Sequence, residues 1–126
     1  MLRRAFPAAD DARIEALLPR FLDLYAESLA LHTRPYPDVE TLLRAIEARG
    51  ARWGIVTNKP EYLAKQVMPQ LVWDSRSAIL IGGDSLPQRK PHPLPLLHSA
   101  QALGVAIEDC VYVGDDQRDI DAARAA

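Results

Sequence analysis

Apolar residues recur at helical spacing in the first part of the chain. Over residues 10–32 they fall at intervals of three and four, which predicts an amphipathic helix, and Pro19 within it predicts a kink or the start of a second helix. The two prolines of TRPYPD (33–38) predict an extended linker. A second helical stripe follows, with Asp38 as its expected N-cap and Gly50 placed to end it.

From residue 52 the pattern changes to short apolar runs separated by helical stripes. The runs, each of which predicts a strand, are RWGIVTN (52–58), SAILIGG (77–83) and DCVYVG (109–114). The stripes predict helices from Pro60 to about Gln70, from Pro93 to Leu103, and from about Arg118 onward. Near-continuous apolar strands that alternate with helices indicate a parallel sheet covered on both faces. The predicted fold class is therefore α/β, with a Rossmann-like parallel sheet in the order βαβαβ.

Composition and charge narrow the class of protein. Apolar residues make up 48% of the 126 positions and the formal net charge is −2, so nucleic acid and acidic membrane surfaces are not expected partners. No apolar run reaches membrane-spanning length and no secretion signal is recognisable, which favours a cytoplasmic location. The single cysteine, Cys110, is expected to be buried, and Trp53 and Trp73 are expected to pack in the core.

Polar residues stand at the end of each predicted strand. They are Thr57 and Asn58 after the first, Asp84 and Ser85 after the second, and Asp115 and Asp116 after the third. The carboxyl ends of parallel strands share one edge of the sheet, and open α/β folds bind ligands at that edge. We therefore expect a binding site there.

An acidic turn follows the third strand, with Asp115, Asp116 and Asp119 within five positions. A helix cap explains such a turn, because Asp is a favoured N-cap and acidic residues suit the first helical turn. A site for a hard cation such as Mg²⁺ explains it too, since this ion prefers oxygen ligands. The convergence of polar residues at one sheet edge favours the metal site.

Lys90 lies in the stiff loop QRKPHP (88–93), which returns to the same edge. A cation, a hydroxyl and carboxylates at one edge suit a phosphate group and its Mg²⁺ ion. In such a site the carboxylates hold the metal, the hydroxyl donates to a phosphoryl oxygen and the lysine neutralises charge.

Three stretches, VTNKP (56–60), KPHP (90–93) and VGDDQRDI (113–120), resemble in order the second, third and fourth motifs of the haloacid dehalogenase superfamily. The phosphoglycolate phosphatase-like group of magnesium-dependent phosphatases is the most similar. The resemblance implies a partial α/β core over residues 35–126, preceded by the last part of a helical cap over residues 1–34.

The resemblance also implies roles for individual residues. Thr57 would hydrogen-bond the phosphoryl group with help from the Asn58 backbone, and Lys90 would bind the phosphoryl group and the nucleophile. Asp115 would be the direct Mg²⁺ ligand, and Asp119 would support the metal through water or by orienting another ligand. Asp116 would cap the last helix instead.

One motif of the superfamily does not occur in these residues. Its aspartate nucleophile and its general acid/base stand in a D-x-D-G-T motif, whereas the one D-x-D of this sequence is Asp119-Ile120-Asp121, in a predicted helix and without Gly-Thr. The expectation is an internal fragment of a longer phosphatase, inactive by itself. Because the nucleophile strand would lie between them, the strand carrying Ile55 should pair with that carrying Leu80 and leave an edge open toward Val113.

The expected activity is hydrolysis of a small phosphate monoester, 2-phosphoglycolate first, through an aspartyl-phosphate. Within the superfamily, WGIVTNKP and GDDQRDI resemble the N-acetylmuramic acid 6-phosphate phosphatases at least as well. A non-catalytic phosphate- or metal-binding module is an alternative from another class. A two-component receiver domain also combines acidic residues with Thr and Lys, but it places its acidic pair after the first strand, and in this chain the pair comes last.

Overall fold

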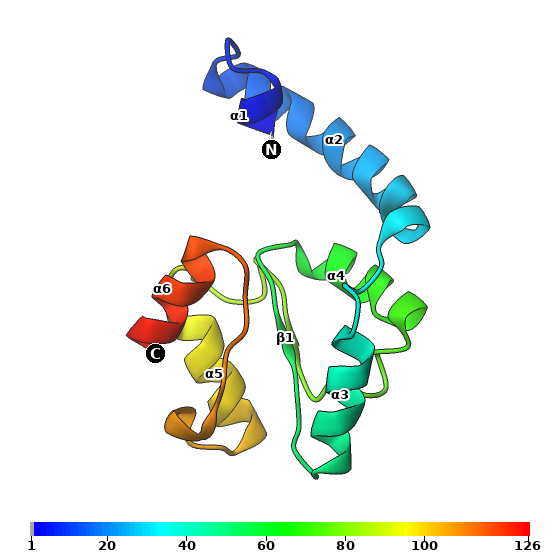
Figure 1. Ribbon diagram of the computed structural model, residues 1–126. Helices are drawn as coiled ribbons and strands as arrows, with labels where there is room; N and C mark the ends of the chain where they lie inside the picture. The colour runs from blue at the N-terminus through cyan, green and yellow to red at the C-terminus, as the bar shows by residue number, and fades with distance from the viewer. Residues whose placement is uncertain (1) are drawn as a thin grey trace. The chain divides into compact units, whose positions relative to one another are not determined.

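The computed structural model describes residues 2–126, and the side chains of all of these except residues 30–32 (Figure 1). The chain forms two compact units, which divide between Thr33 and Arg34. Within the described residues no helix combines the length and the apolarity that a membrane span requires.

The first unit consists of helices α1 (Leu2–Ala5) and α2 (Asp11–His32). The Asp10 side chain caps α2 by accepting a hydrogen bond from the Arg13 backbone N–H at 2.8 Å. Pro19 lies inside α2, so the expected second helix does not start there. The helix tolerates the proline at the cost of one backbone hydrogen bond, because proline has no N–H.

The second unit contains four α-helices and two short 3₁₀ turns among its described elements. They are α3 (Val39–Ala48), α4 (Glu61–Val67), η1 (Pro69–Leu71), α5 (Leu94–Leu103), η2 (Ile107–Asp109) and α6 (Gln117–Ala125). Asp38 stands at the N-cap position of α3 as expected, but its φ is +66° and its side chain makes no capping hydrogen bond. Gly104 ends α5 in the left-handed conformation at φ +64°, which glycine adopts without strain.

A pair of short parallel strands, β1 (Ile55–Val56) and β2 (Leu80–Ile81), forms the sheet. Ile55 lies opposite Leu80, so the expected pairing of these two strands is confirmed. Backbone hydrogen bonds at both ends hold the register, from Ala78 N–H to Trp53 O at 2.8 Å and from Thr57 N–H to Ile81 O at 2.9 Å. Both strands are shorter than the apolar runs that predicted them.

The prediction of a third strand over 109–114 is wrong. Its first residue belongs to η2, and no backbone ladder joins residues 110–114 to β1 within the described chain. Val111 and Val113 are 90% and 81% exposed. A strand is defined by its partner, and this segment has none among the described residues.

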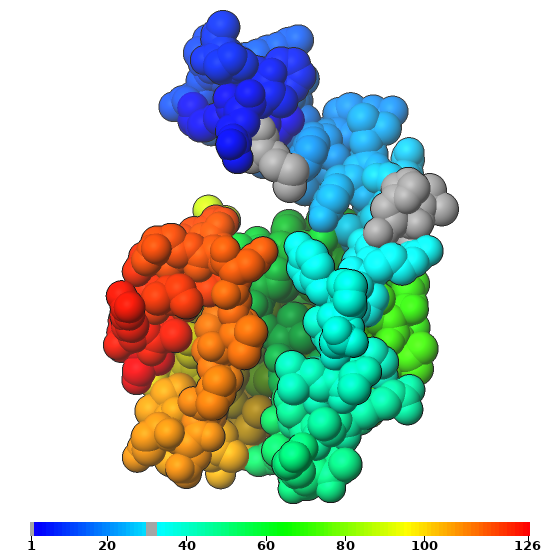
Figure 2. All heavy atoms as spheres, in the orientation of Figure 1, coloured from blue at the N-terminus to red at the C-terminus, as the bar shows by residue number. Residues whose placement is uncertain are grey.

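The same segment overturns the expectation of a buried Cys110, which is exposed. Figure 2 shows this part of the chain, in orange, on the surface of the second unit. An apolar run keeps its residues out of water only when other elements cover it. The expected absence of a backbone ladder between residues 53–57 and 110–114 is confirmed for the described chain.

Helices pack on both sides of the strand pair, α3 and α4 on one side and α5 and α6 on the other (Figure 1). The buried apolar residues of this unit are Leu63, Ala64, Val67, Met68, Ile81, Leu96, Ala100 and Ala122. Two charged residues are buried as well, Lys90 and Asp119. Lysine and aspartate are almost never fully buried unless they are paired, so these two mark the place to look for a site.

Candidate phosphate and metal site

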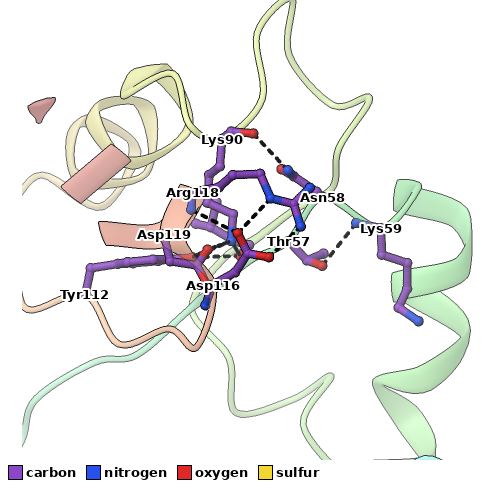
Figure 3. Close-up of polar contacts among 9 residues, drawn as sticks. Thr57, Asn58, Lys59, Lys90, Tyr112, Asp116, Arg118 and Asp119 are labelled. Atoms are coloured by element: carbon purple, nitrogen blue, oxygen red, sulfur yellow. Dashed lines mark hydrogen bonds and ion pairs between the residues drawn. The ribbon is translucent and has the colours of Figure 1, made fainter. Parts of the chain in front are cut away.

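The Lys90 ammonium group lies at the carboxyl end of β1, held by three acceptors (Figure 3). Its Nζ atom is 2.6 Å from Asp119 Oδ1, 2.6 Å from the Tyr112 hydroxyl and 2.8 Å from the Val56 carbonyl oxygen. Lys90 comes from the loop after β2, whose Lys90–Pro91 peptide bond is cis, and Asp119 comes from the first turn of α6. The contact therefore joins three separate segments of the second unit.

The Lys90–Asp119 pair stays ionised. Burial lowers the pKa of Lys90, but the hydrogen bonds to Asp119 and Tyr112 outweigh it and the net pKa lies above its usual value. Burial raises the pKa of Asp119, but the Lys90 ammonium and the Asp116 backbone N–H outweigh it and the net pKa is lowered. Burial raises the pKa of Tyr112, so its hydroxyl keeps its proton at neutral pH.

The acidic turn is organised as a capping box for α6. The Asp116 carboxylate accepts from the Arg118 backbone N–H at 2.9 Å, while Asp119 Oδ2 accepts from the Asp116 N–H at 3.1 Å. The expected role of Asp116 as a cap is confirmed. The Arg118 guanidinium also binds the Asp116 carboxylate through two nitrogens, at 2.8 and 2.7 Å, and holds the pKa of Asp116 well below its usual range.

The turn after β1 carries the hydroxyl of the site. Thr57 Oγ1 accepts a hydrogen bond from the Lys59 backbone N–H at 3.1 Å. No described residue takes the hydroxyl proton, which leaves it for a ligand. The Asn58 side chain donates to the Lys90 carbonyl oxygen at 2.8 Å, so this turn and the Lys90 loop are bonded to each other (Figure 3).

Asp115 lies at the start of the acidic turn and is exposed. Among the described residues it is the carboxylate of this turn without a hydrogen bond or ion pair, since Asp116 is bound by Arg118 and Asp119 by Lys90. No cluster of three or more acidic, histidine or cysteine side chains forms within the described chain. One free carboxylate fits Mg²⁺, which usually keeps several waters and takes one or two protein carboxylates.

Tyr112 is the residue of the site that the sequence interpretation missed. It stands between Val111 and Val113. In an extended backbone, successive side chains point to opposite sides. This alternation could have identified Tyr112 from the sequence, because it places the tyrosine side chain on the side opposite to its two valine neighbours. Its Lys90 partner lies 22 residues away, which local pattern does not reveal.

Comparison with known proteins places the chain in a family. A model of the haloacid dehalogenase-like hydrolases matches residues 2–126, and the chain therefore belongs to that family. The phosphoglycolate phosphatase of Xylella fastidiosa (strain Temecula1) is 57% identical over 122 residues, which are 97% of this chain and 53% of that protein. The N-acetylmuramic acid 6-phosphate phosphatase of Pseudomonas aeruginosa is 41% identical over 117 residues, 93% of this chain and 52% of the relative.

A solved structure agrees with the fold. A protein from Haemophilus somnus 129PT, described as a predicted phosphoglycolate phosphatase, superposes with a TM-score of 0.85 at 32% identity, covering 94% of this chain and 52% of its own. The resemblance to the superfamily and the α/β fold class are thereby confirmed. The chain spans about half the length of the curated relatives that it matches, at 53% and 52%.

Proposed function

We propose that this chain supplies the phosphate- and metal-binding part of a magnesium-dependent phosphatase, whose substrate is a small phosphate monoester and first of all 2-phosphoglycolate. The observation that supports this most strongly is the buried Lys90 ammonium, fixed beside the Thr57 turn and the acidic turn. A preorganised cation of this kind stabilises negative charge far better than a mobile surface lysine. The phosphoglycolate phosphatase names of relatives at 55–57% identity support this choice of substrate.

Each side chain has one task in this proposal. Thr57 donates its hydroxyl proton to a phosphoryl oxygen, and the Asn58 backbone N–H donates to another. Lys90 faces the charge that develops on the phosphoryl group. Asp115 is the direct Mg²⁺ ligand, and Asp119 supports it from behind by holding the Asp116 N–H and Lys90 in place. When bound, Mg²⁺ would neutralise charge on the phosphoryl oxygens.

The covalent step is proposed for a protein of the length that the relatives have. An aspartate oxygen attacks phosphorus as the phosphorus–oxygen bond to the substrate breaks, and the general acid/base of the D-x-D-G-T motif gives the leaving alcohol its proton. Water then hydrolyses the aspartyl-phosphate to inorganic phosphate and the free aspartate. The D-x-D-G-T motif that supplies this aspartate does not occur in these 126 residues. We expect the 126 residues alone to show no turnover and to behave as a non-catalytic binding module.

Phosphate release by the full-length gene product tests the proposal. We expect release from 2-phosphoglycolate that stops on chelation with EDTA and returns on addition of Mg²⁺. The Pseudomonas aeruginosa relative makes N-acetylmuramic acid 6-phosphate the second substrate to assay, and a higher kcat/KM for it would move the assignment to that sugar phosphate. Absence of release from every phosphate monoester, by folded protein with Mg²⁺, would overturn the phosphatase proposal.

A further inference from the structure

A second loop lies against the turn that carries Thr57. Residues 82–85 (Gly-Gly-Asp-Ser) follow β2 and bond directly to the segment after β1. The Gly83 N–H donates to the Lys59 carbonyl oxygen at 2.8 Å, and the Glu61 N–H donates to Asp84 Oδ1 at 2.7 Å. We call residues 82–85 the GGDS loop.

Ser85 links both sides of this contact. Its Oγ atom accepts from the Gly82 N–H at 2.7 Å and donates to Glu61 Oε2 at 2.6 Å. The GGDS loop is therefore closed on itself and tied to Glu61 by two different groups, the Asp84 carboxylate and the Ser85 hydroxyl.

The two glycines of the loop are required by close approach. A Cβ atom on Gly82 would lie 2.5 Å from Glu61 Cα, which is closer than real atoms come. A Cβ atom on Gly83 would overlap the carbonyl group of Asn58. The loop thus packs its backbone against the backbone of Asn58, Lys59 and Glu61.

Asn58 connects this packing to the candidate site. Its backbone carries the contact with Gly83, and its side chain donates to the Lys90 carbonyl oxygen at 2.8 Å. A displacement of the GGDS loop would therefore move the turn after Thr57 directly, and it would move the Lys90 loop through the Asn58 hydrogen bond.

Helix capping alone does not account for Asp84. It lies 23 residues from Glu61, whereas the caps of α2 and α6, Asp10 and Asp116, directly precede their helices. Pro60, at the N-cap of α4, makes no side-chain cap. The Asp84 carboxylate accepts from the first N–H of α4. The same hydrogen bond fixes the loop after β2 against the segment after β1.

We propose that the GGDS loop positions residues 57–61, the turn that carries Thr57 and Asn58, and that Asp84 is a positioning residue for the reaction. This inference rests on the proposed function for its catalytic consequence. A positioning residue of this kind acts through another group and not by its own contact with phosphate or metal. It acts through the Glu61 N–H and so holds Thr57 and Asn58 in the geometry that the phosphoryl group requires.

Kinetics of the full-length protein test the inference with Asp84→Ala, Asp84→Asn and Glu47→Ala. We expect Asp84→Ala to lower kcat about tenfold with little change in KM, because a displaced turn loses contacts made in the transition state. Asp84→Asn keeps an oxygen that accepts from the Glu61 N–H and should restore kcat to within about twofold of wild type. Glu47→Ala removes a carboxylate at the opposite end of the strands, so it should lower thermal stability and leave kcat unchanged.

Hydrogen exchange of the same variants gives a readout that does not depend on activity. We expect faster amide exchange over residues 57–61 in Asp84→Ala, near wild-type exchange in Asp84→Asn, and no change there in Glu47→Ala. Unchanged kcat together with unchanged exchange over 57–61 in Asp84→Ala would overturn the inference. Failure of the wild-type protein to release phosphate would instead overturn the proposed function, and the exchange comparison would still test the positioning.

Discussion

The two ends of the β1–β2 pair each gather cations, carboxylates and at least one aromatic ring. At the amino end Arg76 binds Glu40 at 2.6 Å and Glu47 at 2.9 and 3.1 Å. The indole N–H groups of Trp73 and Trp53 donate to the same two carboxylates, at 3.2 and 2.8 Å, and the two rings meet edge to face. The two rings pack against each other as expected, but both are half-buried and do not belong to the buried core.

The carboxyl end uses the same kinds of group differently. Lys90 has one carboxylate, a phenol and a backbone carbonyl oxygen as partners, and it is almost fully buried. At the amino end the Arg76 guanidinium and the two indole N–H groups all bind the Glu40 and Glu47 carboxylates, and Arg44 also binds Glu40, so these groups satisfy one another. The carboxyl end leaves the Thr57 hydroxyl proton and the Asp115 carboxylate without partners among the described residues. A closed network stabilises, whereas one with free groups beside a fixed charge can bind a ligand.

The largest expected difference between the two ends comes from removing their cations. In the full-length protein, Lys90→Met should lower phosphate release about 10³-fold, because it removes the charge that we propose to face the phosphoryl group. Arg76→Met should leave kcat within about twofold and lower the Tm by a few degrees. Kinetics on variants shown to be folded by circular dichroism check both. Equal losses of kcat in the two variants would mean that the two ends do not differ in function.

Removal of the free carboxylate should have the next largest effect. Asp115→Asn should lower kcat about 10²-fold, since a neutral amide binds Mg²⁺ weakly. Glu47→Gln, a matched change at the amino end, should leave kcat unaltered. Titration of both variants with Mg²⁺ gives the measurement, and near-normal turnover of Asp115→Asn at saturating Mg²⁺ would contradict its role as a ligand.

The contribution of the amino-end network to the free energy of unfolding should depend on pH in the acid range. Hydrogen bonds from Trp73 and Arg76 lower the pKa of Glu40, and those from Arg76 and Trp53 lower the pKa of Glu47. Because both values are lower in the folded chain, their contribution is complete above the unfolded value of about 4.3 and is lost as the pH falls through the folded values. The stability difference between wild type and Arg76→Met should therefore be full at pH 7 and become smaller as the pH falls below about 4.3. Urea unfolding at pH 7, 5 and 3.5 measures it, and a constant difference would contradict the assignment.

Sequence pattern predicted the parts of the fold that depend on local chemistry. The helical stripes, the cap at Asp116 and the closing Gly104 all follow from interactions within a few residues. The pairing of Ile55 with Leu80 was expected from the resemblance to the superfamily, because its nucleophile strand would lie on the other side of the Ile55 strand.

What depends on a distant partner could not be predicted. The apolar run over 109–114 reads as a strand, but it has no ladder within the described chain, so Cys110, Val111 and Val113 face outward. In the site, the pattern brought Thr57, Lys90 and the acidic turn to one edge but could not give their contacts. Whether Asp119 faces a metal or Lys90 depends on tertiary packing, and the structure pairs it with Lys90.

The smallest expected effect concerns Tyr112, whose hydroxyl lies 2.6 Å from Lys90 Nζ and 3.1 Å from the Val56 carbonyl oxygen. Tyr112→Phe should cost about 1 kcal/mol of unfolding free energy, the ordinary contribution of a hydrogen bond. The cost stays small because Lys90 and the Val56 carbonyl oxygen are bonded to each other at 2.8 Å, so removal of the hydroxyl leaves neither unsatisfied. The charge of Lys90 remains, and kcat should stay within about threefold of wild type. Urea unfolding and phosphate release check the two expectations. A tenfold loss of kcat at unchanged stability would show that the phenol takes part in the reaction, and Tyr112 would then join Thr57, Lys90 and Asp115 among the proposed functional groups of the carboxyl end.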